Sequence, residues 1–275
     1  MIRAFRLVTA DPDRLVAFYQ SIGFVSGQTI AIADDEMQVL GLPGSGRRHP
    51  LTLGDSRIEL DWFDPPGLPY PADANAADLI FQHLALVTDD AGTAWHRATD
   101  AGATPISRGG PIRLPKSAGG VTAGKFRDPD GHPLEFLQFP AGANPAWTGS
   151  GMMGIDHSAI SVSDIAASRR FYARHGLADG RTSFNRGSAQ VALDGLEDVQ
   201  VDILPMNPPT TPPHVELLGY HIPTGRPHTP LAANDIAATR IVWRAETDAL
   251  LRDPDGHLHQ LTRKDRSPAD TVSRR

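Results

Sequence analysis

Two histidines and two glutamates lie inside stretches whose side chains alternate as in β-strands. His83 and His157 each share a face with small residues, while the opposite face is apolar, and Glu135 and Glu216 alternate with apolar neighbours. A carboxylate in such a strand is costly unless it is paired or bound to a metal ion. Taken singly, each residue is more often an ordinary strand histidine or a glutamate paired with an arginine. A metal site depends on whether the fold brings the four together.

Two short motifs recur along the chain and indicate an internal duplication. The sequence RDPDGH occurs at 127–132 and at 252–257, where Pro and Gly suit a tight hairpin turn. The segments RLVAFYQSIGF (14–24) and ASRRFYARHGL (167–177) each follow a strand-like stretch and an aspartate. A strand, an Asp-led turn and a helix are therefore predicted at both places, and again over 81–103.

These signals predict repeated β-α-β-β-β modules. Three of them cover about 1–70, 78–140 and 153–225. The fourth, about 235–263, has room for a first strand over 238–245 and for the last hairpin, but not for a helix between them.

A Gly-, Pro- and Ala-rich stretch over 141–153 separates the halves and is interpreted as a linker. The predicted N-terminal domain, 1–140, holds modules one and two. The predicted C-terminal domain, 154–263, holds modules three and four, and 264–275 forms a charged tail.

The RDPDGH hairpins, the strand-then-FY helices and the strands with IEL (58–60) and VELL (215–218) resemble the vicinal oxygen chelate superfamily. That superfamily includes glyoxalase I, extradiol dioxygenases and bleomycin-resistance proteins. The resemblance spans about 1–263 and implies an α+β fold. Paired βαβββ modules then form cup-shaped mixed β-sheets with helices outside, here as two tandem domains. The resemblance also implies metal ligands on the first and last strands of each module.

Aligning the repeats gives two implied ligand positions per module. In modules one to four they are Ala4 and Glu59, His83 and Glu135, His157 and Glu216, and Arg240 and Gln260. Pairing of modules within each half gives two partial sites. Pairing across the halves joins modules two and three into a complete two-His, two-Glu set and leaves modules one and four unable to hold a divalent ion well. Pairing across the halves is the simpler hypothesis.

The complete set of His83, Glu135, His157 and Glu216 predicts one divalent metal ion, such as Zn, Ni, Co, Mn or Fe(II). An ion there polarises a carbonyl, and a carboxylate takes the proton from the neighbouring carbon. By the resemblance to glyoxalase I, Glu135 aligns with the usual base and Glu216 assists. This implies isomerase or lyase chemistry on a small carbonyl or diol substrate.

Two other functions stay open. An extradiol dioxygenase acting on catechols needs Fe(II) or Mn(II) held by two histidines and one carboxylate, which His83, His157 and Glu135 supply if modules pair across the halves. A non-catalytic protein that sequesters an antibiotic or another small molecule would retain no ion after purification.

A Gly-rich basic stretch over 107–128 is interpreted as a loop ahead of the closing strand of module two. It carries four candidates for holding a substrate carboxylate or phosphate, since loops beside a rigid scaffold often carry function: Arg108, Arg113, Lys116 and Lys125.

Four further histidines are given other roles. His132 and His257 recur in both RDPDGH motifs, including the one whose module lacks the acid, so a structural role is predicted. His214 shares the face of Glu216 and is an alternative ligand. His259 is one residue out of the ligand register and is expected to face away from the site.

Composition narrows the class of protein. The 275 residues include no cysteine, which excludes disulfides and thiolate metal sites. A net charge of −6 with interspersed signs gives no basic stripe for nucleic acid. There is no apolar run near about eighteen residues and no signal-peptide pattern. We therefore expect a cytoplasmic protein that acts on a small molecule, as a monomer with tandem domains or as a homodimer.

Overall fold

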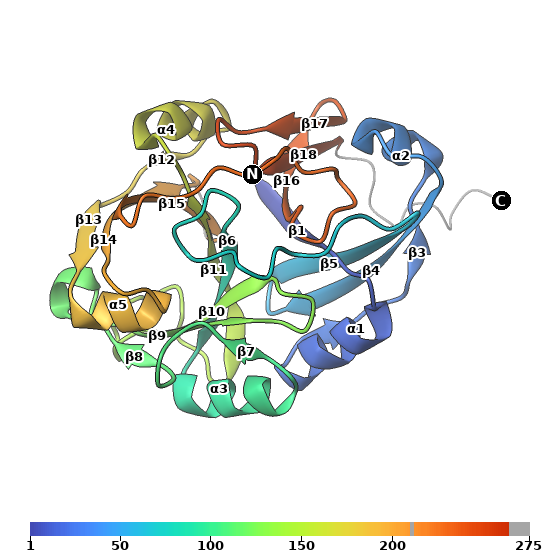
Figure 1. Cartoon of the computed structure of the whole chain (residues 1–275). Coiled ribbons are helices and arrows are strands. Elements are labelled where there is room, and N and C mark those ends of the chain that lie inside the picture. The colour runs from blue at the N-terminus through green and yellow to red at the C-terminus, as the bar shows by residue number, and fades with distance from the viewer. Residues whose placement is uncertain (210–211, 264–275) are drawn as a thin grey trace.

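The first three modules each begin with a strand and a helix, as the repeated segments predict (Figure 1). The computed structural model describes residues 1–209 and 212–263, so the predicted tail lies outside the described residues. Module one contains β1 (Ile2–Val8), α1 (Pro12–Ser21), β2 (Val25–Ser26), β3 (Ile30–Ala31), α2 (Asp34–Leu40), β4 (Ser45–Leu53) and β5 (Ser56–Asp64). Module two contains β6 (Gln82–Thr88), α3 (Ala91–Asp100), β7 (Thr104–Pro105), β8 (Ile112–Arg113), the 3₁₀-helix η1 (Lys116–Ala118), β9 (Thr122–Arg127) and β10 (Pro133–Gln138).

The second half repeats this order. Module three contains β11 (Met152–Ser161), α4 (Ile165–Arg174), β12 (Ala178–Asp179), β13 (Ser183–Arg186), α5 (Ser188–Asp194), β14 (Gln200–Asn207) and β15 (His214–Ile222). Module four contains only β16 (Arg240–Ala245), β17 (Ala249–Arg252) and β18 (Leu258–Arg263), which confirms the absence of a helix between its first strand and its hairpin.

Aspartate caps begin the three long helices. The side chains of Asp11, Asp90 and Asp164 accept hydrogen bonds from backbone N–H groups three residues later, at 3.0–3.1 Å. Such a cap satisfies a donor that the first turn of a helix leaves free and stabilises the helix by about 1 kcal/mol. The Asp-led turns of the sequence therefore fix where these helices start.

The two short helices α2 and α5 were not predicted. Each has seven residues and no side-chain hydrogen bond at its N-cap, so its start carries no sequence signal. Each ends at a glycine in the left-handed conformation, Gly41 (φ 69°) and Gly195 (φ 68°). Among the described residues no helix is both long and apolar enough to cross a membrane.

The two sheets combine modules across the halves of the chain. Sheet A has the order β17-β18-β16-β1-β5-β4-β2, with β3 beside β4, and so joins modules one and four. Sheet B has the order β12-β14-β15-β11-β6-β10-β9-β7, with β13 beside β14 and β8 beside β9, and joins modules two and three. The strands that join them, β1 with β16 and β6 with β11, are antiparallel. The strand order therefore agrees with pairing across the halves.

All four modules share one register. The candidate ligand on each closing strand pairs with the residue two beyond the candidate on the first strand: Glu59 with Arg6, Glu135 with Ala85, Glu216 with Ala159, and Gln260 with Val242. Because side chains alternate between faces, both candidates of a module lie on the same face of their sheet. The alignment of Arg240 and Gln260 in the shortened module is thereby confirmed.

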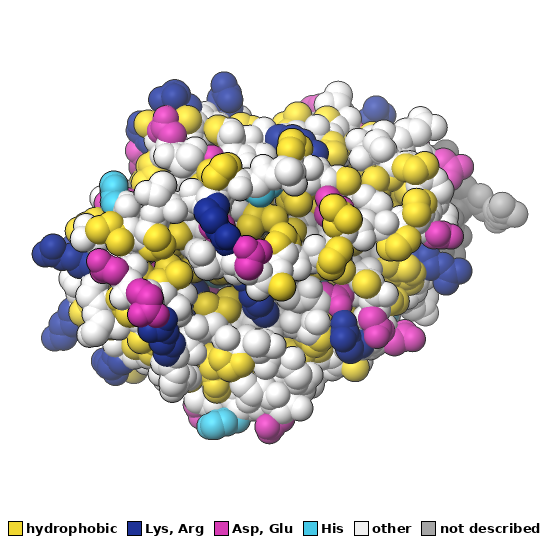
Figure 2. Space-filling model, in the orientation of Figure 1, with side chains coloured by type: hydrophobic (Ala, Val, Ile, Leu, Met, Phe, Trp, Pro, Cys, Tyr) yellow, Lys and Arg dark blue, Asp and Glu magenta, His cyan; other side chains and the backbone are white. Residues whose placement is uncertain are grey.

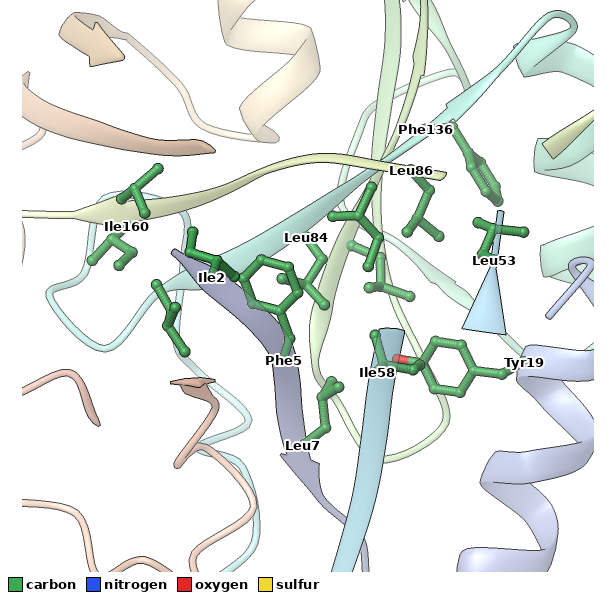
Figure 3. Packing of buried hydrophobic residues seen from close by; sticks show 14 of the residues in the cluster. Ile2, Phe5, Leu7, Tyr19, Leu53, Ile58, Leu84, Leu86, Phe136 and Ile160 are labelled. Carbon is green, nitrogen blue, oxygen red and sulfur yellow. The ribbon is translucent and has the colours of Figure 1, made fainter. Parts of the chain in front are cut away.

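The opposite faces of the two sheets share the main hydrophobic core. Figure 3 shows Phe5 and Leu7 of β1 in the same packed region as Leu84 and Leu86 of β6. Residues of α1, α3 and α4 belong to this cluster. We call these the core faces, and the faces that carry the candidate ligands the polar faces. The core holds the sheets in fixed positions behind the site.

The two repeated motifs contact each other between modules. Tyr19 in α1 donates a hydrogen bond to Asp128 of the first RDPDGH turn (3.0 Å), and Tyr172 in α4 donates to Asp253 of the second (3.1 Å). Burial, followed by the neighbouring aspartate, raises the pKa of each tyrosine well above its usual value, so both phenols stay neutral donors. Each contact joins a helix of one sheet to a turn of the other.

Replacing Tyr19 with Phe should lower the free energy of unfolding by about 1.5–3 kcal/mol, because a buried hydrogen bond to a charged group is lost. Urea denaturation of wild type, Tyr19→Phe, Asp128→Asn and the double variant measures this. The double variant should lose clearly less than the sum of the single losses. Additive losses would show that the two residues do not interact.

Candidate functional site

The four candidate ligands meet on the polar face of sheet B. His83 Nε2 lies 3.0 Å from Glu135 Oε2, and His157 Nε2 lies 3.7 Å from the same oxygen. His157 Nε2 is also 3.6 Å from Glu216 Oε2. Two of the residues come from module two and two from module three. We call these four residues the His/Glu cluster.

The two carboxylates of the cluster differ in how deeply they are buried. The side chain of Glu135 is 8% exposed and that of Glu216 is 20% exposed, so Glu216 lies nearer to solvent. The two histidine side chains are 2% and 6% exposed. Charges in such a place are stable only when they compensate one another.

The two histidines of the cluster differ in protonation state. Burial lowers the pKa of His83, and Glu135 opposes this only in part, so His83 is neutral. Burial also acts on His157, but Glu216, Asp156 and Glu135 outweigh it and raise its pKa well above the usual value. His157 is therefore the cationic partner of the cluster in the metal-free protein.

Both carboxylates are ionised. Burial favours the neutral acid in Glu135, yet His157, His83 and Lys125 hold its pKa well below the usual value. For Glu216, burial is likewise outweighed by His157 and His214, and the pKa is lowered. Two carboxylates and two imidazoles, once His157 has lost its proton, form a donor set that suits a divalent cation.

Lys125 is buried beside the cluster and is part of a strand. It lies in β9 opposite Glu135, which corrects the interpretation of 107–128 as one long loop. Its Nζ donates to Asp194 Oδ1 (2.6 Å), at the end of α5. Burial would lower the pKa of this lysine, but Asp194 and Glu135 outweigh it and raise the pKa. Asp194 was not predicted, because it belongs to a helix that the sequence does not signal.

The other three basic candidates lie elsewhere. Arg108 pairs with Glu197 (2.5 Å) and donates to the carbonyl of Gly195 (3.1 Å), which ties its segment to the end of α5. Arg113 is exposed and lines a cavity of about 180 Å³ together with Gln138 and Phe139. Lys116 is exposed in η1. Substrate contacts of these residues stay predictions.

The remaining histidines take the places predicted for them. His132 binds Asp128 (2.8 Å) and the carbonyl of Ile236 (3.1 Å), and His257 donates its backbone N–H to Asp253 (2.9 Å), so both are structural. His259 faces away from the site and accepts a hydrogen bond from Trp243 (3.0 Å).

Asp156 was not predicted from the sequence, and His214 was predicted only as an alternative ligand. His214 Nε2 lies 3.5 Å from Glu216, and Asp156 Oδ2 lies 3.0 Å from His157 Nδ1. Asp156, His157 and His214 have ligand atoms within 4.8 Å of one another, and the same holds for His83, Glu135 and His157. Both groups use His157.

Ion pairs fill the equivalent place on the polar face of sheet A. Arg240 Nη2 donates to Asp61 (2.6 Å), and Glu59 accepts from Arg6 and Arg57 (both 2.7 Å). The fourth position, Gln260, donates to Glu36 (2.8 Å) of α2. Ala4 takes the place that His157 has in sheet B.

Arginines keep the acids of sheet A charged. Burial would raise the pKa of Glu36, but Arg6 and Arg48 outweigh it and lower the pKa to about 2. Burial acts on Glu59 as well, but the same arginines, together with Arg57, lower the pKa of Glu59. Guanidinium groups thus neutralise carboxylates there, whereas the acids of sheet B face histidines.

The visible surface mixes charges of both signs. Figure 2 shows Lys and Arg side chains interspersed with Asp and Glu, without a large area of one sign on this face. The charges that matter for the candidate site are the buried ones on the polar face of sheet B.

Comparisons with known proteins agree with this architecture. A family model described as Glyoxalase/Bleomycin resistance protein/Dioxygenase superfamily matches residues 2–136. The structure of a glyoxalase I variant from Zea mays is 15% identical, with 94% of this chain and 91% of that chain covered and a TM-score of 0.60. A putative dioxygenase from Bacillus subtilis is 12% identical, with 96% and 85% covered and a TM-score of 0.55. A search of curated proteins gave no match.

Residues 2–136, just under half of the chain, therefore belong to the glyoxalase, bleomycin-resistance and dioxygenase superfamily. The structural neighbours extend the shared fold over most of its length, including modules three and four. The predicted fold class and the resemblance to the vicinal oxygen chelate superfamily are therefore confirmed.

Proposed function

We propose that this protein is a divalent-metal-dependent enzyme of glyoxalase type, which transfers a proton at the carbon next to a carbonyl group of a small substrate. The observation that supports this most is the convergence of two imidazoles and two ionised carboxylates from modules two and three on one buried face. Because one chain supplies all four residues, the site needs no second subunit.

Three of the four residues have donor atoms near the spacing that a small ion needs. Two atoms that each lie about 2.1 Å from one ion, at tetrahedral or octahedral angles, are about 3.0–3.4 Å apart. The ligand atoms of His83, Glu135 and His157 lie within 4.8 Å of one another. Glu216 lies 3.6 Å from His157 but outside that group, so its side chain would have to move toward an ion held by the other three. Zn, Ni, Co, Mn and Fe(II) all accept such mixed ligands.

The residues divide the chemistry between them. An ion bound there would polarise the carbonyl group of the substrate. Glu135, kept ionised by His83, His157 and Lys125, takes the proton from the neighbouring carbon. Glu135, protonated by this step, then gives the proton to the adjacent carbon, and Glu216, the more exposed carboxylate, assists. Lys125 and Asp194 form a neutral pair beside Glu135 and hold α5 over the polar face.

A second candidate is an extradiol dioxygenase. His83, Glu135 and His157 by themselves form a two-histidine, one-carboxylate group, with ligand atoms within 4.8 Å of one another. That set suits Fe(II) and leaves positions for a catechol and for oxygen. The two candidates differ in whether Glu216 binds the ion.

Protein purified without chelators should contain about one divalent ion per chain by elemental analysis. His83→Ala and His157→Ala should each lose it, because each removes a ligand of the same cluster. His221→Ala, at an exposed histidine, should keep it. Gln260→Glu should gain no second ion, since Arg240 already occupies that place. A His157→Ala variant that keeps wild-type metal would exclude a site shared by modules two and three.

Binding of the ion should release about one proton at pH 7, because His157 is the protonated ligand while His83 is neutral and the two glutamates are ionised. Its raised pKa means that the apparent affinity rises with pH until that pKa is passed, by up to about tenfold per unit. Calorimetry in buffers of different ionisation enthalpy counts the protons. A count near zero or two contradicts this assignment.

The metal-loaded enzyme should exchange deuterium from D₂O into the carbon next to the carbonyl of small hydroxyketones and thiol adducts of oxoaldehydes. Glu135→Gln should slow exchange by about 100-fold or more, whereas Glu197→Gln, at an exposed acid, should not. Nuclear magnetic resonance follows the exchange, with metal content measured in parallel. Oxygen uptake with a catechol and Fe(II), without exchange, would favour the dioxygenase instead. Failure of the protein to retain any ion would favour a binding protein.

A further inference from the structure

The carboxylate of Asp156 is buried beside the His/Glu cluster. The residue is 5% exposed, and its two oxygens have different partners. Oδ2 accepts from His157 Nδ1 (3.0 Å), and Oδ1 accepts from the indole Nε1 of Trp147 (2.7 Å). Trp147 belongs to the linker between the halves. A chain of two hydrogen bonds thus runs from the linker to a candidate ligand.

A β-bulge places Asp156 on this side of the sheet. Strict alternation would turn the residue before His157 toward the core face. Along β11, however, Ile155 pairs with Leu86 and His157 pairs with the next residue of β6, Ala85. Asp156 is therefore an extra residue without a partner, which lets its side chain lie beside that of His157.

The same bulge occurs in sheet A. Ile2 pairs with Trp243 and Ala4 pairs with Val242, so Arg3 is the extra residue of β1. Arg3 and Ala4 are the counterparts of Asp156 and His157 in the repeat. The bulge belongs to the scaffold, and only in sheet B does it deliver a carboxylate next to a histidine.

We propose that Asp156 is a positioning residue for the metal ligand His157, and that Trp147 holds Asp156 in place. This inference rests on the proposed metal site. By accepting a hydrogen bond from Nδ1–H, Asp156 fixes the ring so that Nε2, which would bind the ion once deprotonated, is directed between Glu135 and Glu216. A carboxylate in this position orients a ligating histidine and increases its basicity.

The other histidine has no such partner, which makes the role of Asp156 specific. Among the described residues, the buried Nδ1 of His83 has no hydrogen-bond partner. Gln82, which precedes His83, instead donates to Ser158 (3.0 Å). Trp147 can approach β11 closely because residue 154 is glycine. A Cβ at Gly154 would lie 2.9 Å from the indole ring of Trp147.

Asp156→Asn should weaken Co(II) binding by about 10- to 100-fold, measured by competition with a chromophoric chelator. The absorption bands of the Co(II)-saturated variant should match those of wild type, because the ligands are the same. Gln82→Ala, at the matching position before His83, should change affinity by less than about twofold. Circular dichroism of each variant shows whether it is folded.

Trp147→Phe should also weaken Co(II) binding, by less than Asp156→Asn, and should remove the largest part of the fluorescence quenching that Co(II) causes. Unchanged affinity in Asp156→Asn, with wild type binding normally, would overturn the positioning role alone. Altered Co(II) bands at saturation would make Asp156 a ligand and overturn it as well. If wild type binds no Co(II), the proposed function fails and the positioning role falls with it.

Discussion

The antiparallel pairing of β6 with β11 is the contact on which the candidate site depends. Ala159 opposes His83 and His157 opposes Ala85, so the two histidines come from neighbouring strands and share one face. The parallel neighbours β10 and β15 then add Glu135 and Glu216 at equivalent positions. A shift of one residue in this pairing would turn a histidine into the core. The segment between the halves, interpreted from the sequence as a linker, contains Trp147, which donates a hydrogen bond to Asp156 beside the cluster.

Compensation of buried charge explains why two similar sheets carry different residues. Every carboxylate on a polar face needs a cation, since an unpaired buried charge destabilises the fold by several kcal/mol. In sheet A, arginines of the chain itself supply that charge, and Arg240 lies where sheet B has His83. In sheet B, imidazoles face the acids, and imidazole is a ligand that can exchange its proton for a metal ion. One scaffold thus carries a permanent ion-pair network in sheet A and the proposed metal site in sheet B.

Local patterns in the sequence predicted the repeated elements and the shared ligand register. Alternation along short strands, aspartate caps and the RDPDGH turn are short-range signals, and each is present in the structure. The helix that carries Asp194, the burial of Lys125 and the position of Asp156 were not predictable in the same way. They depend on a short uncapped helix, on long-range packing and on a bulge that exists only once two distant strands pair. Residues that support a site are therefore harder to find than its candidate ligands.

The presence of the RDPDGH turn in module four is explained by its contact with the other sheet. Module four has neither a helix nor an acid at its ligand position, yet it contains RDPDGH, whose Asp253 accepts the hydrogen bond from Tyr172. Tyr172 belongs to module three, so this bond joins sheet A to the sheet that carries the His/Glu cluster. Tyr19 and Asp128 make the reciprocal connection. The side chain of Gln260 donates a hydrogen bond to Glu36 of module one, which shares sheet A with module four, whereas the turn connects both sheets, so the turn is needed even in a module that carries no acid at its ligand position.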